Sequence, residues 1–266
     1  MKSSPRLAFL LILFVALSWS CGCGKLKAKN RLNEGTRAYN KGEYEKAEQL
    51  FKESIEASGD FPQARLYYAA AIRAQFLPGG DSDQNKAIGR KAIQAYEDVI
   101  KYSSNPTDID AAHAFVADIY KGLGEYEKQR EWVLKRIQLK GQADEVRAQS
   151  YYTLAVAFWD DSYKITQKYL IPKTNPPEYK PVEEWEAGDE AKVKEIVMKG
   201  LQNMEESLKI NPKYANCYSY RALLYREQAK LESDPKIKEE LRQKAETDIE
   251  EFQRLNREAQ AAQAAG

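Results

Sequence analysis

The chain lacks most of the groups on which enzyme sites are built. Its 266 residues include one histidine, His113, and three cysteines. A single histidine excludes a metal site with several histidine ligands, and it leaves only one imidazole that could act as a base. The sequence has no Gly-rich nucleotide-binding loop, no G-x-S-x-G segment and no C-x-x-C pair. We therefore predict that the protein is not an enzyme and that it carries no metal and no cofactor.

An excess of charge of one sign is also missing. The chain has 41 Lys and Arg residues against 40 Asp and Glu residues, for a net charge of +1. A nucleic-acid-binding surface needs a basic excess, so nucleic acid is not an expected partner. In contrast, the chain is rich in aromatic contact surface, with 17 Tyr and four Trp residues. Together with 43% hydrophobic residues, which can fill a core, this composition favours a binding protein.

No acidic residue precedes Glu34, and the chain begins like a targeting signal. Lys2 and Arg6 come first, and an apolar run follows over residues 7–17. At about 1.5 Å per residue this run is too short to span a hydrocarbon layer of roughly 30 Å. Small residues then lead into a cysteine. This arrangement resembles the lipobox of bacterial lipoproteins, in which that cysteine is acylated and becomes the mature N-terminus.

Two cysteines compete for lipidation. Three small residues precede Cys23, whereas Cys21 lies two places after the bulky Trp19, so we favour Cys23 and keep Cys21 as the alternative. The resemblance implies that residues 1–22 are a removed signal peptide and that residues 23–29 form a lipidated tether. It also implies a lipid anchor in the bacterial cell membrane or outer membrane, on the side facing the periplasm. An ordinary cleaved signal peptide and an uncleaved N-terminal anchor are the alternatives.

An internal repeat organises the rest of the chain. Small and aromatic residues recur at helical spacing over residues 35–54, at Gly35, Tyr39, Gly42-Glu43-Tyr44, Ala47, Phe51 and Ser54. This segment closely resembles the tetratricopeptide repeat (TPR), a hairpin of two helices. Small residues let the two helices approach closely, and large residues fill the space between neighbouring hairpins.

The same pattern continues downstream. The small residues of the first helices fall at Gly35, Ala71, Ala117, Ala155 and Ala222, and their second-helix partners at Ala47, Ala92, Gln129, Gly200 and Ala245. Longer spacings indicate insertions inside hairpins two, four and five. The resemblance implies an all-α fold, a right-handed α-solenoid of about five TPR hairpins over residues 30–258, with an Ala/Gln-rich tail over 259–266 that frays. A generic antiparallel helical bundle is the alternative, but it does not explain the regular spacing.

Several single residues also receive a structural prediction. His113 and Cys217 both lie in helical stretches, and we expect each to be a buried structural residue. Gln129 stands where the repeat has a small residue, which predicts looser packing in hairpin three. The short loop over residues 77–83 is expected to extend a turn. Its two aspartates do not make up the ligand set of a calcium site.

The longest insertion runs over residues 160–191 and combines four prolines with several aromatic residues. Prolines stop helix continuation, and the aromatics argue against plain disorder. We consider two interpretations. In the first, a loop folds back over the edge of the hairpin and covers apolar surface. In the second, an arm or lid contacts a partner through Tyr169, Tyr179 and Trp185.

In TPR proteins the concave face is built mainly from the first helices of the hairpins. The resemblance therefore implies a partner-binding groove, whose candidate residues are Tyr39, Arg65, Tyr68, Phe115, Asp118, Tyr152, Trp159, Tyr220 and Arg226. Tyr and Trp suit the recognition of a peptide or helix segment because they provide contact area at low entropic cost. The groove does not show the Lys/Asn clamp by which some TPR domains hold a C-terminal carboxylate.

We predict a non-catalytic scaffold, anchored in the bacterial cell envelope, that binds a protein partner in its groove and serves the assembly of envelope or outer-membrane complexes. The alternative is a periplasmic binding module for a small molecule or glycan that serves an envelope transporter or enzyme.

Overall fold

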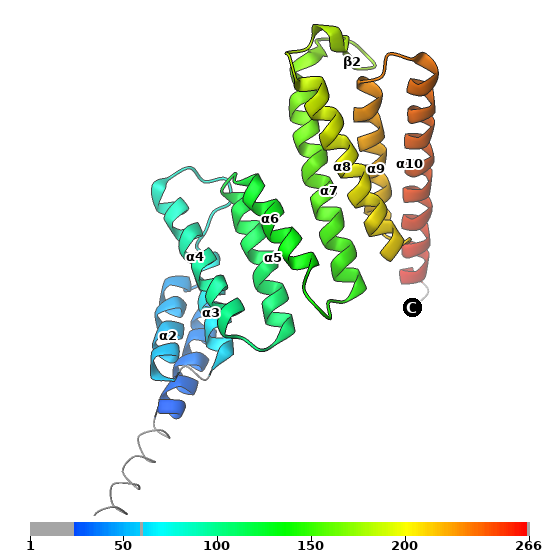
Figure 1. The fold of residues 1–266 in the computed structure, drawn as a ribbon. Coiled ribbons are helices and arrows are strands. Elements are labelled where there is room, and N and C mark those ends of the chain that lie inside the picture. Colours follow the sequence, from blue (N-terminus) through cyan, green and yellow to red (C-terminus); the bar gives the residue numbers. More distant parts are fainter. Residues whose placement is uncertain (1–23, 59–60, 265–266) are drawn as a thin grey trace, which may run out of the picture. The chain divides into compact units, whose positions relative to one another are not determined.

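The computed structural model describes residues 24–58 and 61–264, and these residues fold almost entirely into helices (Figure 1). Consecutive helices form hairpins, as the repeat pattern predicts. The hairpins are the helix over residues 24–40 with α2 (Tyr44–Ala57), α3 (Pro62–Arg73) with α4 (Asp83–Tyr102), α5 (Pro106–Gly122) with α6 (Tyr126–Ile137), α7 (Asp144–Thr166) with α8 (Asp189–Ile210), and α9 (Ala215–Lys230) with α10 (Pro235–Ala264).

The helices divide into two compact units, and the boundary lies between Trp132 and Val133. We call them the first and the second unit and describe each by itself. That residues 30–258 form one continuous right-handed solenoid stays a prediction.

Close helix approach occurs at the small residues that the repeat pattern singles out. A Cβ atom added to Gly35 would lie 2.6 Å from the Cε1 atom of Phe51, on the second helix of the same hairpin. At Gly200 on α8, an added Cβ would lie 2.7 Å from Leu224 of α9. Neither site has room for a larger residue, since Phe51 and Leu224 are themselves buried. The alanines of the pattern are all buried as well, at Ala47, Ala71, Ala92, Ala117, Ala155, Ala222 and Ala245.

The turns of hairpins one and three are built alike. Gly42 and Gly124 adopt φ angles of +77° and +76°. A residue with a Cβ rarely adopts such angles, and glycine accepts them at little cost. The Gly-acid-aromatic pattern of the sequence therefore marks the points where the chain reverses between the paired helices.

The single histidine and the cysteine of the helical region, His113 and Cys217, are buried structural residues, as predicted. Cys217 is fully buried in the core of the second unit, where its Sγ atom lies 3.1 Å from the Oγ of Ser207. His113 is buried on α5; its Nδ1 lies 2.8 Å from the carbonyl oxygen of Ile109, and its ring lies 5.4 Å from that of Trp132. Gln129 is buried too, and its Oε1 lacks a hydrogen-bond partner.

The loop that enlarges hairpin two is a turn extension, as expected, and Asn85 organises it. The Asn85 Nδ2 group donates to the carbonyl oxygens of Leu77 (2.8 Å) and Gly80 (2.9 Å). Its Oδ1 accepts from the backbone N–H of Leu77 at 2.8 Å. Ser82 caps α4 by accepting from the backbone N–H of Asn85.

The insertion in hairpin four lengthens both helices and adds a folded loop between them. α7 continues to Thr166 and α8 begins at Asp189, which leaves only residues 167–188 outside the two helices. These contain two short 3-10 helices, η1 (Gln167–Tyr169) and η2 (Val182–Glu184), and two strands, β1 (Leu170–Ile171) and β2 (Glu178–Tyr179). The strands pair antiparallel, with Leu170 opposite Tyr179.

Both ends of the helical region extend further than predicted. The first helix begins at residue 24, so residues 24–29 are not a tether. Ala28 is buried, and its carbonyl oxygen accepts from the Oγ of Ser54 at 2.7 Å, which fixes this end to α2. At the other end α10 continues to Ala264, in keeping with the high helix propensity of Ala; that this tail frays in solution stays a prediction. Cys21 and Cys23 lie outside the described residues. None of the helices over 24–58 and 61–264 is long and apolar enough to cross a membrane.

Candidate protein-binding surface

Five aromatic rings of the second unit form one connected row. α7 contributes Tyr152, Trp159 and Tyr163, whose spacings of seven and four residues place them on one helix face. Tyr220 lies on α9, and Tyr214 immediately precedes that helix. We call these five residues the aromatic strip. Along it, neighbouring ring centroids are 5.0 Å (Tyr214–Tyr152), 5.6 Å (Tyr152–Tyr220), 5.4 Å (Tyr220–Trp159) and 5.3 Å (Trp159–Tyr163) apart.

The rings hold one another in favourable geometry. Tyr220 meets Tyr152 and Trp159 edge to face, at interplanar angles of 85° and 83°, and Tyr163 stacks on Trp159 at 26°. Such pairs stabilise beyond the area they bury, by roughly 0.5–1.5 kcal/mol each. None of the strip residues is buried, and the side chain of Tyr163 is 39% exposed. The strip is therefore an ordered aromatic surface that solvent reaches in part.

Two hydroxyl groups of the strip can hydrogen-bond to a ligand. Among the described residues, those of Tyr152 and Tyr220 have no hydrogen-bond partner; the Nε1 of Trp159 also has none, but it is buried. Burial raises the pKa of Tyr152, helped by the neighbouring Tyr220 and Tyr214. The Tyr152 hydroxyl is protonated at neutral pH, as an ordinary tyrosine is, and can donate a hydrogen bond.

An ion pair with a buried carboxylate lies at the Tyr163 end of the strip. Lys230 pairs with Glu227 at 2.7 Å, and the hydroxyl of Thr166 donates to the other carboxylate oxygen at 2.7 Å. The Lys230 Nζ atom lies 4.0 Å from the ring centroid of Tyr179 and 5.6 Å from that of Tyr163. This cation joins the insertion to α9 and so fixes the insertion beside the strip.

Two of the three aromatic residues predicted as partner contacts in the insertion serve its packing. The rings of Tyr169 and Trp185 stack at 4.4 Å with an interplanar angle of 5°, and both side chains are buried in the core of the second unit. The Tyr169 hydroxyl donates to Asp189 at 2.7 Å, and the Trp185 Nε1–H donates to the Lys180 carbonyl oxygen at 3.0 Å. As partner contacts, Tyr169 and Trp185 were predicted wrongly, because their faces cover each other and the core. The geometry matches a loop folded back over the hairpin.

In the first unit the predicted groove residues form small local contacts. The Arg73 guanidinium lies 4.4 Å from the ring centroid of Phe115 and pairs with Asp118 at 2.9 Å. The Arg65 guanidinium lies 4.4 Å from the ring centroid of Tyr102.

The remaining groove candidates do not join these contacts. The ring of Tyr39 contacts that of Tyr44 in the turn of hairpin one, at 5.2 Å. Tyr68 packs against both buried clusters of the first unit, and burial raises its pKa. In the second unit, Arg226 pairs with Glu246 at 3.1 Å.

The structure therefore brings together three of the nine groove candidates, Tyr152, Trp159 and Tyr220, in the aromatic strip. Tyr214 and Tyr163 complete the strip and were missed. The four-residue spacing from Trp159 to Tyr163 is visible in the sequence and could have indicated that residue, whereas Tyr214 precedes its helix and has no such signal.

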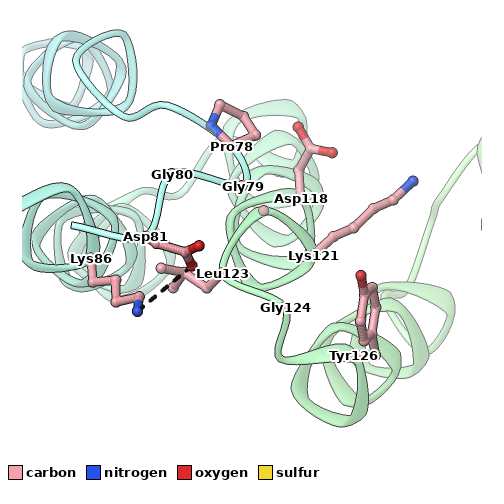
Figure 2. Close-up of a pocket in the computed structure, with 11 residues that line it drawn as sticks. Pro78, Gly79, Gly80, Asp81, Lys86, Asp118, Lys121, Leu123, Gly124 and Tyr126 are labelled. Carbon is pink, nitrogen blue, oxygen red and sulfur yellow. Dashed lines mark ion pairs between the residues drawn. The ribbon is translucent and has the colours of Figure 1, made fainter. Parts of the chain in front are cut away.

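A shallow pocket of about 440 Å³ lies in the first unit, between the loop of hairpin two and the end of α5. Figure 2 shows the charged side chains of Asp118 and Lys121 at its wall, and Lys86 paired with Asp81 at 3.9 Å across the loop. Among the described residues, no group of three His, Cys, Asp or Glu side chains is placed to hold a metal ion.

Comparison with known proteins identifies the fold. A MamA protein is similar over 87% of this chain and 92% of its own, with 13% identity and a TM-score of 0.52. MamA from Desulfovibrio magneticus RS-1 is similar over 87% of this chain and 96% of its own, with 14% identity and a TM-score of 0.51. YrrB, described as a TPR protein with an unusual peptide-binding site, covers 88% of this chain and 89% of its own, with 11% identity and a TM-score of 0.47. No family model and no curated protein sequence matches the chain.

The likeness to MamA, itself a TPR protein, agrees with the small-residue register seen in the hairpins. The protein has the all-α fold of the tetratricopeptide repeat proteins.

Proposed function

We propose that the protein is a non-catalytic scaffold that binds a protein partner through the aromatic strip of its second unit. The observation that carries the proposal is the connection of all five rings, from Tyr214 to Tyr163, on the faces of α7 and α9. A TPR fold presents such first-helix faces to ligands, which supports a peptide or helix segment as the ligand.

The chemistry of the strip favours a protein partner. Tyr and Trp are over-represented among residues that dominate binding energies, because they contribute large rigid surfaces with a polar edge. The rings already hold one another, so little side-chain entropy is lost when a ligand covers them. The free hydroxyl groups of Tyr152 and Tyr220 can donate to carbonyl oxygens of an extended peptide.

We propose further that the scaffold is held in the bacterial cell envelope, facing the periplasm, by acyl chains on Cys23 or, alternatively, Cys21, after removal of the leader. Its role there would be the assembly of envelope or outer-membrane complexes. The test is mass spectrometry of the mature N-terminus, which we expect to find acylated at Cys23. An unmodified N-terminus downstream of Cys23 would remove the anchor from the proposal, and acylated Cys21 would correct only the site.

Partner binding is tested by affinity capture from detergent-solubilised membranes with matched variants. Tyr220→Ala removes the central ring of the strip, whereas Tyr225→Ala removes a partly exposed ring of the same helix that lies beside Lys244 of α10. We expect Tyr220→Ala to weaken capture of a specific protein about tenfold or more, as for a binding hot spot, and Tyr225→Ala to leave it unchanged. Equal capture by both variants, with unchanged circular dichroism, would exclude the strip as the binding surface.

A further inference from the structure

The first helix begins with a strongly basic and partly apolar surface. Lys27 and Lys29 are exposed in its first two turns, and the side chain of Leu26, which immediately precedes Lys27, is 63% exposed. We call these three residues the basic–apolar face. Lys25 and Arg31 add further positive charge to this stretch, and no acidic residue occurs before Glu34.

The stability of the helix itself does not explain this run of lysines. The helix macrodipole favours acidic residues near the N-terminus and disfavours cations there. Six helices follow that rule, since α2, α4, α5, α6, α7 and α8 each carry an acidic residue in the first turn. The helix over residues 24–40 carries lysines instead, as α10 does in its first turn. Helix stability therefore does not account for the lysines of the first helix.

The acidic residues in the last turns of the neighbouring helix are already paired. Glu53 of α2 pairs with Arg31 at 2.9 Å, and Glu56 lies 4.0 Å from Lys52. Within the described residues, neither Lys27 nor Lys29 has a carboxylate within salt-bridge distance. Because Ala28 between them is buried against α2, the two lysines and Leu26 face away from the hairpin.

We propose that the basic–apolar face binds the anionic headgroups of a phospholipid membrane. Lysines at a membrane surface are attracted to anionic headgroups, and an exposed leucine can enter the boundary between headgroups and acyl chains. That this face lies close to a membrane rests on the proposed lipid anchor, since Cys23 immediately precedes the helix. A basic surface next to an acyl chain supplies the second of the two signals that stable membrane attachment needs.

The chain contains a matched control for this surface. The first turn of α10 has a similar composition, with an exposed Lys236, a partly exposed Lys238 and Ile237, whose side chain is 43% exposed. There, however, Glu239 and Glu240 follow directly. The two acids cancel the charge of the two lysines, so this second surface should not bind anionic lipid.

The test measures how much protein co-sediments with phospholipid vesicles. The protein tested is the chain from residue 23 with the substitution Cys23→Ser, which keeps every described residue but cannot be acylated at that position. Vesicles of phosphatidylcholine alone are compared with an equal mixture of phosphatidylcholine and phosphatidylglycerol. The variants are Lys27→Gln with Lys29→Gln, Leu26→Gln, and the control Lys236→Gln with Lys238→Gln. Circular dichroism checks that each variant is folded.

We expect binding to the mixed vesicles only, with loss at high salt because the attraction is screened. Removing both lysines should weaken partitioning roughly 10- to 30-fold, Leu26→Gln should weaken it less, and the α10 control should match the parent chain. Equal binding to both kinds of vesicle overturns the proposal, as does a lysine variant that binds like the parent or a control that loses as much. Because the tested chain lacks the acyl group, failure of the lipid anchor in mass spectrometry leaves this result unaffected, and the two failures are distinguishable.

Discussion

Replacing Gly35 tests the close helix approach on which the hairpin structure depends. An added Cβ would lie 2.6 Å from Cε1 and 2.7 Å from Cδ1 of Phe51, which is 1% exposed and has no room to move aside. Overpacking of this kind costs about 1–3 kcal/mol. Ala is also about 1 kcal/mol better than Gly inside a helix, so Gly35→Ala should destabilise by a net ~0–2 kcal/mol.

A valine at position 35 should destabilise the hairpin more than an alanine does. Its extra methyl groups meet the ring of Phe51, while its helix propensity is only about 0.4 kcal/mol better than that of Gly. Gly35→Val should therefore lower the free energy of unfolding by about 2–3 kcal/mol. The matched control is Ala191→Val on the exposed surface of α8, which changes helix propensity alone and should cost about 0.6 kcal/mol.

Urea unfolding followed by far-UV circular dichroism measures both variants. A second substitution, Phe51→Leu, makes room for the new side chain, so we expect Gly35→Val with Phe51→Leu to lose less stability than the sum of the two single changes. The reasoning is refuted if Gly35→Val costs no more than Ala191→Val, or if the two substitutions at the contact are additive.

Three further predictions concern groups in the second unit. Asp248, which is 4% exposed, receives two hydrogen bonds from Arg221 at 2.6 and 2.7 Å, so Asp248→Asn should lower the free energy of unfolding by about 2–4 kcal/mol, and Arg221→Met with Asp248→Leu should recover part of it in the same urea assay. The hydrogen bond from Tyr169 and the ammonium of Lys168 hold the pKa of Asp189 below its ordinary value of 3.8. A lowered carboxyl pKa stabilises the folded insertion fully above about pH 4, and this stabilisation is lost as the pH falls through the folded-state pKa. Amide hydrogen exchange of residues 167–188 should therefore become faster over that acidic range. The substitution Asp189→Asn should remove this pH dependence. Burial raises the pKa of the Cys217 thiol to about 11, so a thiol reagent at pH 8 should react with it only after urea unfolding, and rapid reaction of the folded chain would contradict its placement in the core.

The repeat register could be predicted from the sequence because it follows from local contacts. Gly35, Ala47 and Phe51 lie within one hairpin, and their spacing fixes which side chains meet when two helices pack. His113 and Cys217 were assigned to the core on similar grounds, since each lies on a helix among small or apolar neighbours.

The insertion and the groove depend on contacts that spacing does not encode. The stacking of Tyr169 on Trp185 joins residues on either side of two strands, and nothing in the sequence pairs them. Tyr152, Trp159 and Tyr220 were found because first-helix positions of successive hairpins converge. The same rule selected Phe115 as a groove residue. It does not predict the contact with Arg73, whose guanidinium lies over the Phe115 ring.

The central claim, that the aromatic strip of the second unit binds a protein partner, is tested most directly by photocrosslinking in intact cells. A photoreactive amino acid replaces Tyr163, the most exposed ring at the end of the strip, and in a control chain it replaces Met198 on α8, whose side chain is 58% exposed. We predict a crosslinked protein of one defined mass at position 163, absent at position 198 and absent when Tyr220→Ala is added. No crosslink at position 163, or the same crosslink at both positions, would contradict the account.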